Sequence, residues 1–124
     1  MKQKIFFSYA HQDKRYATKV RKVLAGRGVI DDDAVTVDPH KEIKVGDDVR
    51  KVIRDRIGAA NKVVLIATDK AINSPWVNYE IGMAEALGKH IIVVGGRGMR
   101  KSSLLKQFRQ RLGSIEVLEV DPEG

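Results

Sequence analysis

The sequence has no cysteine, few aromatic residues and only short apolar runs, and these shortages exclude several classes of protein. None of its 124 residues is cysteine, which rules out disulfide bridges and thiolate metal sites and fits a reducing compartment. Apolar runs such as Ile91–Val94 are far shorter than the ~18 residues of a membrane-spanning helix. The amino-terminal segment lacks the long apolar stretch of a secretory signal. We therefore expect a cytoplasmic protein with no membrane partner.

The charge balance is strongly basic, with 23 Lys and Arg residues against 16 Asp and Glu and a formal net charge of +7. The basic residues are spread over several segments and alternate with acidic or apolar residues, as on solvated helix faces. Nucleic acid is therefore not expected as the main partner, whereas the charge suits an anionic small molecule such as a dinucleotide. His11, His40 and His90 lack the spacing of metal ligands, so we expect no structural metal.

Apolar runs alternate with amphipathic segments along the whole chain. The predicted strands are residues 4–9, 35–37, 62–67, 91–94 and 115–120. Four helices are predicted. The first follows Asp13, and the second spans 47–60. The third begins after a Ser74 cap with Pro75 in first position, and the fourth runs from Ser102 or Ser103 to about Leu112. The inner strands are apolar throughout, as strands covered on both faces are. The alternation predicts one α/β domain over residues 1–124, a five-stranded parallel sheet of order 2-1-3-4-5 with helices on both faces.

The expected ligand site lies at the carboxyl ends of the strands, because open parallel sheets bind their ligands there. Those ends lead into residues 9–13, 38–46, 68–74 and 95–100. The third helix begins directly after the third of these segments. Its first turn is therefore expected beside the cleft.

This third helix carries two stripes of side chains about 120° apart. The first, which faces the core, consists of Val77, Ile81, Ala84 and Gly88. The second, lying toward the amino end, consists of Trp76, Tyr79, Glu80 and Met83. One interpretation is that Trp76 and Tyr79 pack under a loop while Glu80 is a solvated charge. The other is that all three line the cleft.

A single carboxylate in the cleft suits one kind of reaction. Ordinary glycoside hydrolysis needs two carboxyl groups, because one of them must protonate the leaving oxygen. Nicotinamide leaves its ribose as a neutral base and needs no proton, so one carboxylate is enough to stabilise the oxocarbenium-like transition state. We therefore take Glu80 as the candidate catalytic residue, with Trp76 and Tyr79 as a wall that excludes water.

Several segments, in order, resemble those of the Toll/interleukin-1 receptor (TIR) domain family. Ile5–Tyr9 (IFFSY), followed by Asp13, is similar to the first-strand motif. Asp38–Gly46 falls where the family has its BB loop. Ser74-x-Trp76-x-x-x-Glu80 resembles the catalytic segment of NAD-cleaving members, and 86–94 resembles the bacterial branch. The resemblance covers essentially the whole chain.

The resemblance implies a flavodoxin-like, three-layer fold and two classes of function. Some TIR domains cleave NAD+, as substrate rather than cofactor, to nicotinamide and ADP-ribose or cyclic and conjugated products, often as signals in antiphage defence such as Thoeris. Others are adaptors without chemistry. For a catalytic member the resemblance places Glu80 against the nicotinamide ribose. The expected substrate-binding residues are Ser8, Tyr9, Asp38, Ile43, Ser74, Trp76 and Tyr79.

Two further expectations concern partners and a second family. Self-association through loop 38–46, with its apolar Ile43 and Val45, is expected to be needed for activity, and a sensor or effector protein is a possible partner. Residues 80–89 (EIGMAEALGK) also resemble nucleoside 2-deoxyribosyltransferases, whose helix-borne Glu attacks a deoxyribose. Both families place a glutamate beside an N-glycosidic bond.

Overall fold

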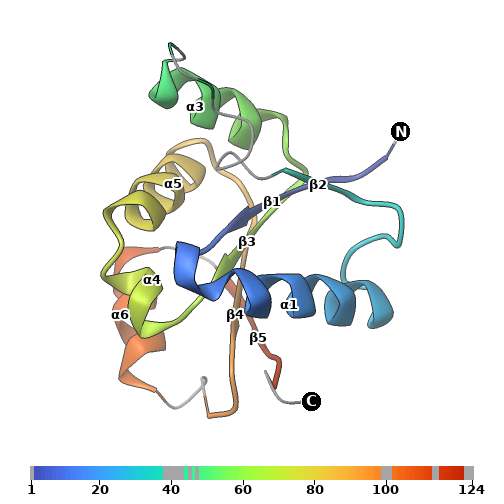
Figure 1. Cartoon of the computed structure of the whole chain (residues 1–124). Coiled ribbons are helices and arrows are strands. Elements are labelled where there is room, and N and C mark those ends of the chain that lie inside the picture. Colours follow the sequence, from blue (N-terminus) through green and yellow to red (C-terminus); the bar gives the residue numbers. More distant parts are fainter. Residues whose placement is uncertain are drawn as a thin grey trace.

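The computed structural model describes residues 2–37, 44, 46, 48–98, 102–112 and 115–121, and its elements alternate as predicted (Figure 1). The strands are β1 (Lys4–Ser8), β2 (Val35–Val37), β3 (Lys62–Ile66), β4 (Ile91–Gly95) and β5 (Ile115–Glu119). The helices are α1 (Lys14–Gly26), α3 (Val49–Ala59), α4 (Asp69–Ile72), α5 (Pro75–Ala86) and α6 (Ser103–Arg111), with a 3₁₀ turn η1 (His11–Asp13) before α1. Neither η1 nor α4 was predicted, because three or four residues give no helical periodicity to detect.

The strands form one sheet in the order β2-β1-β3-β4-β5 with every pair parallel, which confirms the predicted topology. β1 lies between β2 and β3, and its last residue, Ser8, is opposite Leu65. Val64 and Val93, on the two strands next in line, are completely buried, as expected for strands covered on both faces. The carboxyl ends of β1 and β3 therefore lie side by side in the middle of the sheet.

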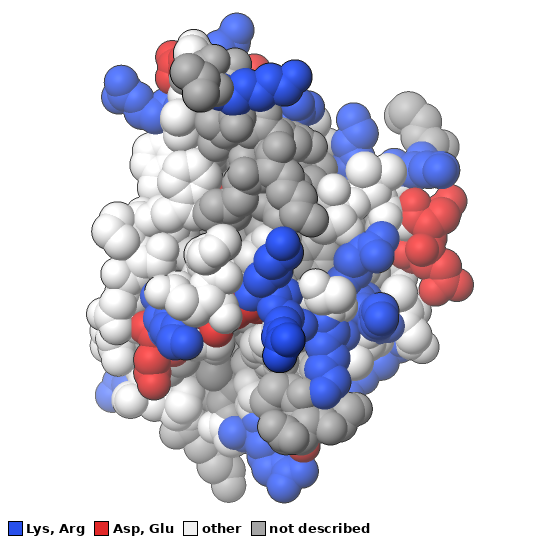
Figure 2. Space-filling model, in the orientation of Figure 1, with Lys and Arg blue, Asp and Glu red and all other residues white. Residues whose placement is uncertain are grey.

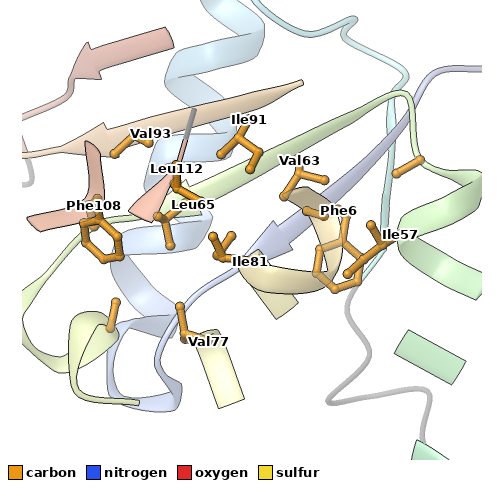
Figure 3. Close-up of a cluster of buried hydrophobic side chains, with 14 of the residues drawn as sticks. Phe6, Ile57, Val63, Leu65, Val77, Ile81, Ile91, Val93, Phe108 and Leu112 are labelled. Atoms are coloured by element: carbon orange, nitrogen blue, oxygen red, sulfur yellow. The ribbon is translucent and has the colours of Figure 1, made fainter. Parts of the chain in front are cut away.

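Alternate residues of each strand contribute to two separate cores, one on each face of the sheet. Ile5 and Phe7 pack with the inner side of α1, while Phe6 packs with residues of α3, α5 and α6. Figure 3 shows this second core, in which Phe6 and Ile57 lie next to each other. Side chains two residues apart on a strand point to the same face. Ser8 therefore points, like Phe6, toward the face that α5 covers.

Serine hydroxyls cap two of the helices. Ser74 Oγ accepts a hydrogen bond from the Val77 amide at 3.2 Å, which confirms the predicted start of α5. Ser102, rather than Ser103, caps α6. Gly88, assigned to the core stripe of α5, is instead exposed and lies after the helix with φ of +67°. The prediction extended the helix too far, because a glycine in the left-handed region ends a helix.

Tyr16 connects α1 to the end of β5. Its hydroxyl donates a hydrogen bond to the carbonyl oxygen of Val120 at 2.7 Å. Burial, the carboxylate of Asp121 and that of Asp13 together raise the pKa of Tyr16 to about 12. The folded state therefore favours the neutral phenol. The resulting stabilisation is complete below pH 10 and is lost as the pH rises from 10 through 12.

Tyr16→Phe tests this contact. We expect the ultraviolet titration of the folded protein to lose its tyrosine transition near pH 12, and the free energy of unfolding at neutral pH to fall by about 1 kcal/mol, as for one hydrogen bond of a half-buried group. Between pH 10 and 12 the stability difference from the parent protein should shrink. An unchanged titration curve in the variant would show that Tyr16 is not the group ionising there.

Candidate functional site

The candidate site lies where the carboxyl end of β1 faces the second turn of α5. Ser8 is the last residue of β1, and Glu80 is the sixth residue of α5. Ser8 Oγ donates a hydrogen bond to Glu80 Oε1 at 2.9 Å, joining residues 72 positions apart in the sequence. The fold thus brings two of the predicted site residues into direct contact.

Both members of this pair are completely buried, with no solvent-exposed surface. In the part of the chain that the structure describes, they are also the only buried residues with polar or charged side chains. Burying a carboxylate is costly unless hydrogen bonds compensate for the lost water, and proteins accept that cost most often at functional sites. The interpretation of Glu80 as a solvated surface charge is therefore wrong.

Glu80 is buried because apolar side chains lie on both sides of it on the inner face of α5. Val77, Ile81 and Ala84 are buried in the core against the sheet, as the first predicted stripe requires. Trp76, Tyr79 and Met83, from the second stripe, are partly buried and pack against the same core. Glu80 belongs to this second stripe, on the side that is next to the first stripe. Its carboxylate is directed toward β1, where Ser8 meets it.

Trp76 and Tyr79 are partly exposed, so each side chain has one side in the core and one side accessible. This arrangement combines the two interpretations given for them, because the same rings support the core and border the accessible surface. Trp76 is the only tryptophan in the chain.

The other predicted site residues are placed differently. Tyr9 is buried in the core on the α1 side of the sheet, the face opposite to the one that holds Glu80. The Ser74 hydroxyl is the cap of α5 and supports the first turn of the helix that carries Trp76. Asp38 and Ile43 lie outside the described residues, as does most of the predicted loop 38–46.

A second polar contact at this edge of the sheet was not predicted. Thr68 Oγ1 donates a hydrogen bond to Asp13 Oδ2 at 2.5 Å, and it also accepts one from the Ala71 amide at 3.1 Å. This pair ties the segment after β1 to the segment after β3, and it caps α4. The sequence indicated Asp13 as the start of a helix and as part of the first-strand motif, but no local signal links residues 55 positions apart.

The described residues form neither a metal-binding cluster nor a membrane-spanning helix. Among the described residues, no group of three or more His, Asp or Glu side chains is placed to hold a metal ion. No helix among them is long and apolar enough to cross a membrane. The buried serine–glutamate pair is therefore the feature that we take as the centre of the site.

The fold and this pair define an open α/β domain of the flavodoxin-like class, with a buried carboxylate at the carboxyl edge of its parallel sheet. The TIR domain family model matches residues 5–116, and the chain belongs to this family. A search of curated protein sequences finds no match.

Solved structures with the same architecture are distant in sequence. The CMP N-glycosidase BcmB of Clostridium botulinum superposes with a TM-score of 0.61 at 15% identity, over 96% of this chain and 89% of that one. A conserved protein from Enterococcus faecalis V583 superposes with a TM-score of 0.62 at 14% identity, over 99% of this chain and 94% of that one. A de novo designed Rossmann 2x3 protein superposes with a TM-score of 0.56 at 16% identity, over 99% of this chain and 82% of that one. At these identities the likeness concerns the fold.

Proposed function

We propose that this TIR domain cleaves the bond between nicotinamide and ribose in NAD+. The observation that carries the proposal is the buried Glu80 carboxylate, held by Ser8 at the carboxyl edge of the sheet. The products are nicotinamide and ADP-ribose or a cyclic or conjugated ADP-ribose signal, as in the bacterial, NAD-cleaving branch of the family. We further propose a cytoplasmic role in antiphage defence or signalling, under the control of a sensor or effector protein.

The proposed reaction needs one negative charge and little water. The bond from the ribose C1′ to the pyridinium nitrogen breaks, its electron pair stays on that nitrogen, and neutral nicotinamide leaves. The positive charge that develops on the ribose is stabilised by the Glu80 carboxylate. Water then adds to C1′ and releases a proton, or a nucleophile of ADP-ribose itself closes a ring. Trp76 and Tyr79 limit the access of bulk water while the bond to nicotinamide breaks.

The surface charge supports an anionic substrate. Five of the thirteen residues of α1 are Lys or Arg and none is acidic. Figure 2 shows the resulting basic surface over α1. Such a field raises the rate at which anions reach the protein, and it does so less at high salt. It is consistent with a dinucleotide that carries two phosphates.

The name of the CMP N-glycosidase denotes cleavage of an N-glycosidic bond, which is compatible with the proposal without identifying the substrate.

The decisive experiment is to incubate concentrated purified protein with NAD+ and to measure free nicotinamide by chromatography. CMP and deoxynucleosides serve as parallel substrates. Nicotinamide release supports the proposal. Release of base only from CMP or a deoxynucleoside would favour a nucleoside-directed glycosidase or transferase, and no release from any substrate would favour an adaptor.

We also propose that activity depends on self-association through loop 38–46. We expect specific activity to rise more steeply than in proportion to protein concentration, because neighbouring copies complete the site. Ile43→Asp should suppress this rise while the melting temperature stays unchanged, and Lys51→Gln, at an exposed position of α3 outside the loop, is the control. Specific activity that is constant down to nanomolar protein, with Ile43→Asp fully active, would show that one chain suffices.

A further inference from the structure

We propose that Ser8 is a positioning residue that fixes the orientation of the Glu80 carboxylate, rather than a ligand of the substrate. This inference rests on the proposed function of Glu80. It assigns Ser8 a different task from the one expected from the sequence, where Ser8 was counted among the substrate-binding residues.

The first observation concerns the apolar surroundings of the contact. Ser8 and Glu80 are the only buried polar or charged residues among those that the structure describes, and they bond to each other at 2.9 Å. Phe6, two positions before Ser8 on the same face of the strand, and Leu65, its partner on β3, are both buried apolar side chains. A serine hydroxyl in such surroundings is costly unless it is hydrogen-bonded. Its interaction with the glutamate therefore accounts for the presence of a polar side chain at the end of an apolar strand.

The second observation is that the hydroxyl is attached to a rigid part of the molecule. β1 is paired on both sides, with β2 and with β3, and Ser8 lies within the pairing to β3. A group on a paired central strand is held more accurately than one on a loop. Glu80, in contrast, has a long side chain whose carboxyl group turns about its last bond. The short side chain is thus fixed by the sheet, and it fixes the longer one.

The consequence for the reaction concerns the geometry and the charge of the carboxylate. A hydroxyl that donates to a carboxylate oxygen favours the ionised form, and it also selects one orientation of the group. A positioned negative charge stabilises the transition state without having to reorganise during the reaction. Loss of the hydroxyl should therefore lower the turnover of bound substrate, and should affect the binding of NAD+ much less.

Three substitutions of Ser8 separate this task from the alternatives. For Ser8→Ala we expect kcat to fall about tenfold with KM nearly unchanged, the size expected for one hydrogen bond to a charged group. We expect the acid limb of its pH–activity profile to move to higher pH. Ser8→Cys, similar in shape but a weak donor, should behave like Ser8→Ala, whereas Ser8→Thr, which keeps the hydroxyl, should retain most of kcat.

Each contrary result overturns the inference in a recognisable way. A rise in KM with kcat unchanged would make Ser8 a substrate ligand. Full activity of Ser8→Ala and Ser8→Cys, with only a lower melting temperature, would make the pair a structural contact. If the added methyl group of Ser8→Thr prevents folding, the agreement of Ser8→Ala with Ser8→Cys still decides between these outcomes.

A measurement without substrate separates this inference from the proposed function. The carboxyl carbon of Glu80 can be followed by NMR during a pH titration of folded Ser8→Ala and of the parent protein. We expect its transition in the variant at higher pH than in the parent protein, because the donor that favours the ionised form is gone. If this shift is present but NAD+ is not cleaved, the proposed function fails and the contact remains as inferred. If NAD+ is cleaved but the transition does not move, the positioning inference fails alone.

Discussion

Replacing Glu80 by glutamine is expected to reduce NAD+ cleavage by at least ~10²-fold while the fold stays intact. Glutamine has nearly the shape of glutamate, and its side-chain oxygen can still accept the hydrogen bond from Ser8 that the structure shows at 2.9 Å. What the variant loses is the negative charge opposite the developing positive charge of the ribose. The expected result therefore separates the charge of Glu80 from its packing.

The measurement is nicotinamide release under identical protein concentrations, together with the melting temperature. Because a buried charge is removed, the melting temperature of Glu80→Gln should equal or exceed that of the parent protein. Glu85→Gln is the matched control, since Glu85 lies on the same helix but is exposed, and its activity should be unchanged. Turnover by Glu80→Gln at a rate close to that of the parent protein would show that Glu80 is not the catalytic group.

Trp76→Ala is expected to lower kcat/KM by roughly 10²-fold, a loss typical of misplaced substrates, while stability decreases only moderately. Trp76 packs against the core from a partly exposed position on the first turn of α5. Its removal should therefore cost less than the ~3–5 kcal/mol of a fully buried aromatic residue. The loss of activity has a separate cause, because the wall proposed to exclude water beside Glu80 loses its indole ring.

Phe108→Ala is the control for this prediction. Phe108 belongs to the same core as Trp76 but is almost completely buried on α6 (Figure 3). We expect it to lose ~3–5 kcal/mol of stability and to keep its activity in proportion to the fraction folded. Urea unfolding combined with activity at low temperature measures both quantities. If Trp76→Ala loses as much stability as Phe108→Ala and its folded molecules remain fully active, Trp76 is a structural residue.

The topology was predictable because each element of ordinary length has its own local signal. The apolar strands 62–66 and 91–95 and the amphipathic helices between them are typical of a parallel sheet, and the family resemblance pointed the same way. The very short η1 and α4 had no such signal. The end of α5 was placed too late because Gly88 continues the apolar spacing, although its backbone conformation ends the helix.

The candidate site was predictable only in part. The order of residues in α5 indicated Glu80, and the first-strand motif indicated Ser8, but the hydrogen bond between them joins residues from two distant segments. Periodicity indicates which face a residue occupies and does not identify its partner across the fold. The placement of Tyr9 on the opposite face follows from strand alternation, since it differs from Ser8 by one position. The hydrogen bond between Thr68 and Asp13 was not predicted for the same reason as the one between Ser8 and Glu80, because it too joins distant segments.

The position of β1 between β2 and β3 has a consequence for synthesis on the ribosome. Chains grow from the amino terminus at about 5–20 residues per second, so the 72 residues from Ser8 to Glu80 take about 4 to 14 seconds. During that interval the first strand is complete while the helix that carries the carboxylate does not yet exist. An unfinished chain therefore has no assembled site. Under the proposed function, every nascent or prematurely terminated copy that stops before α5 therefore lacks the carboxylate and cannot cleave NAD+.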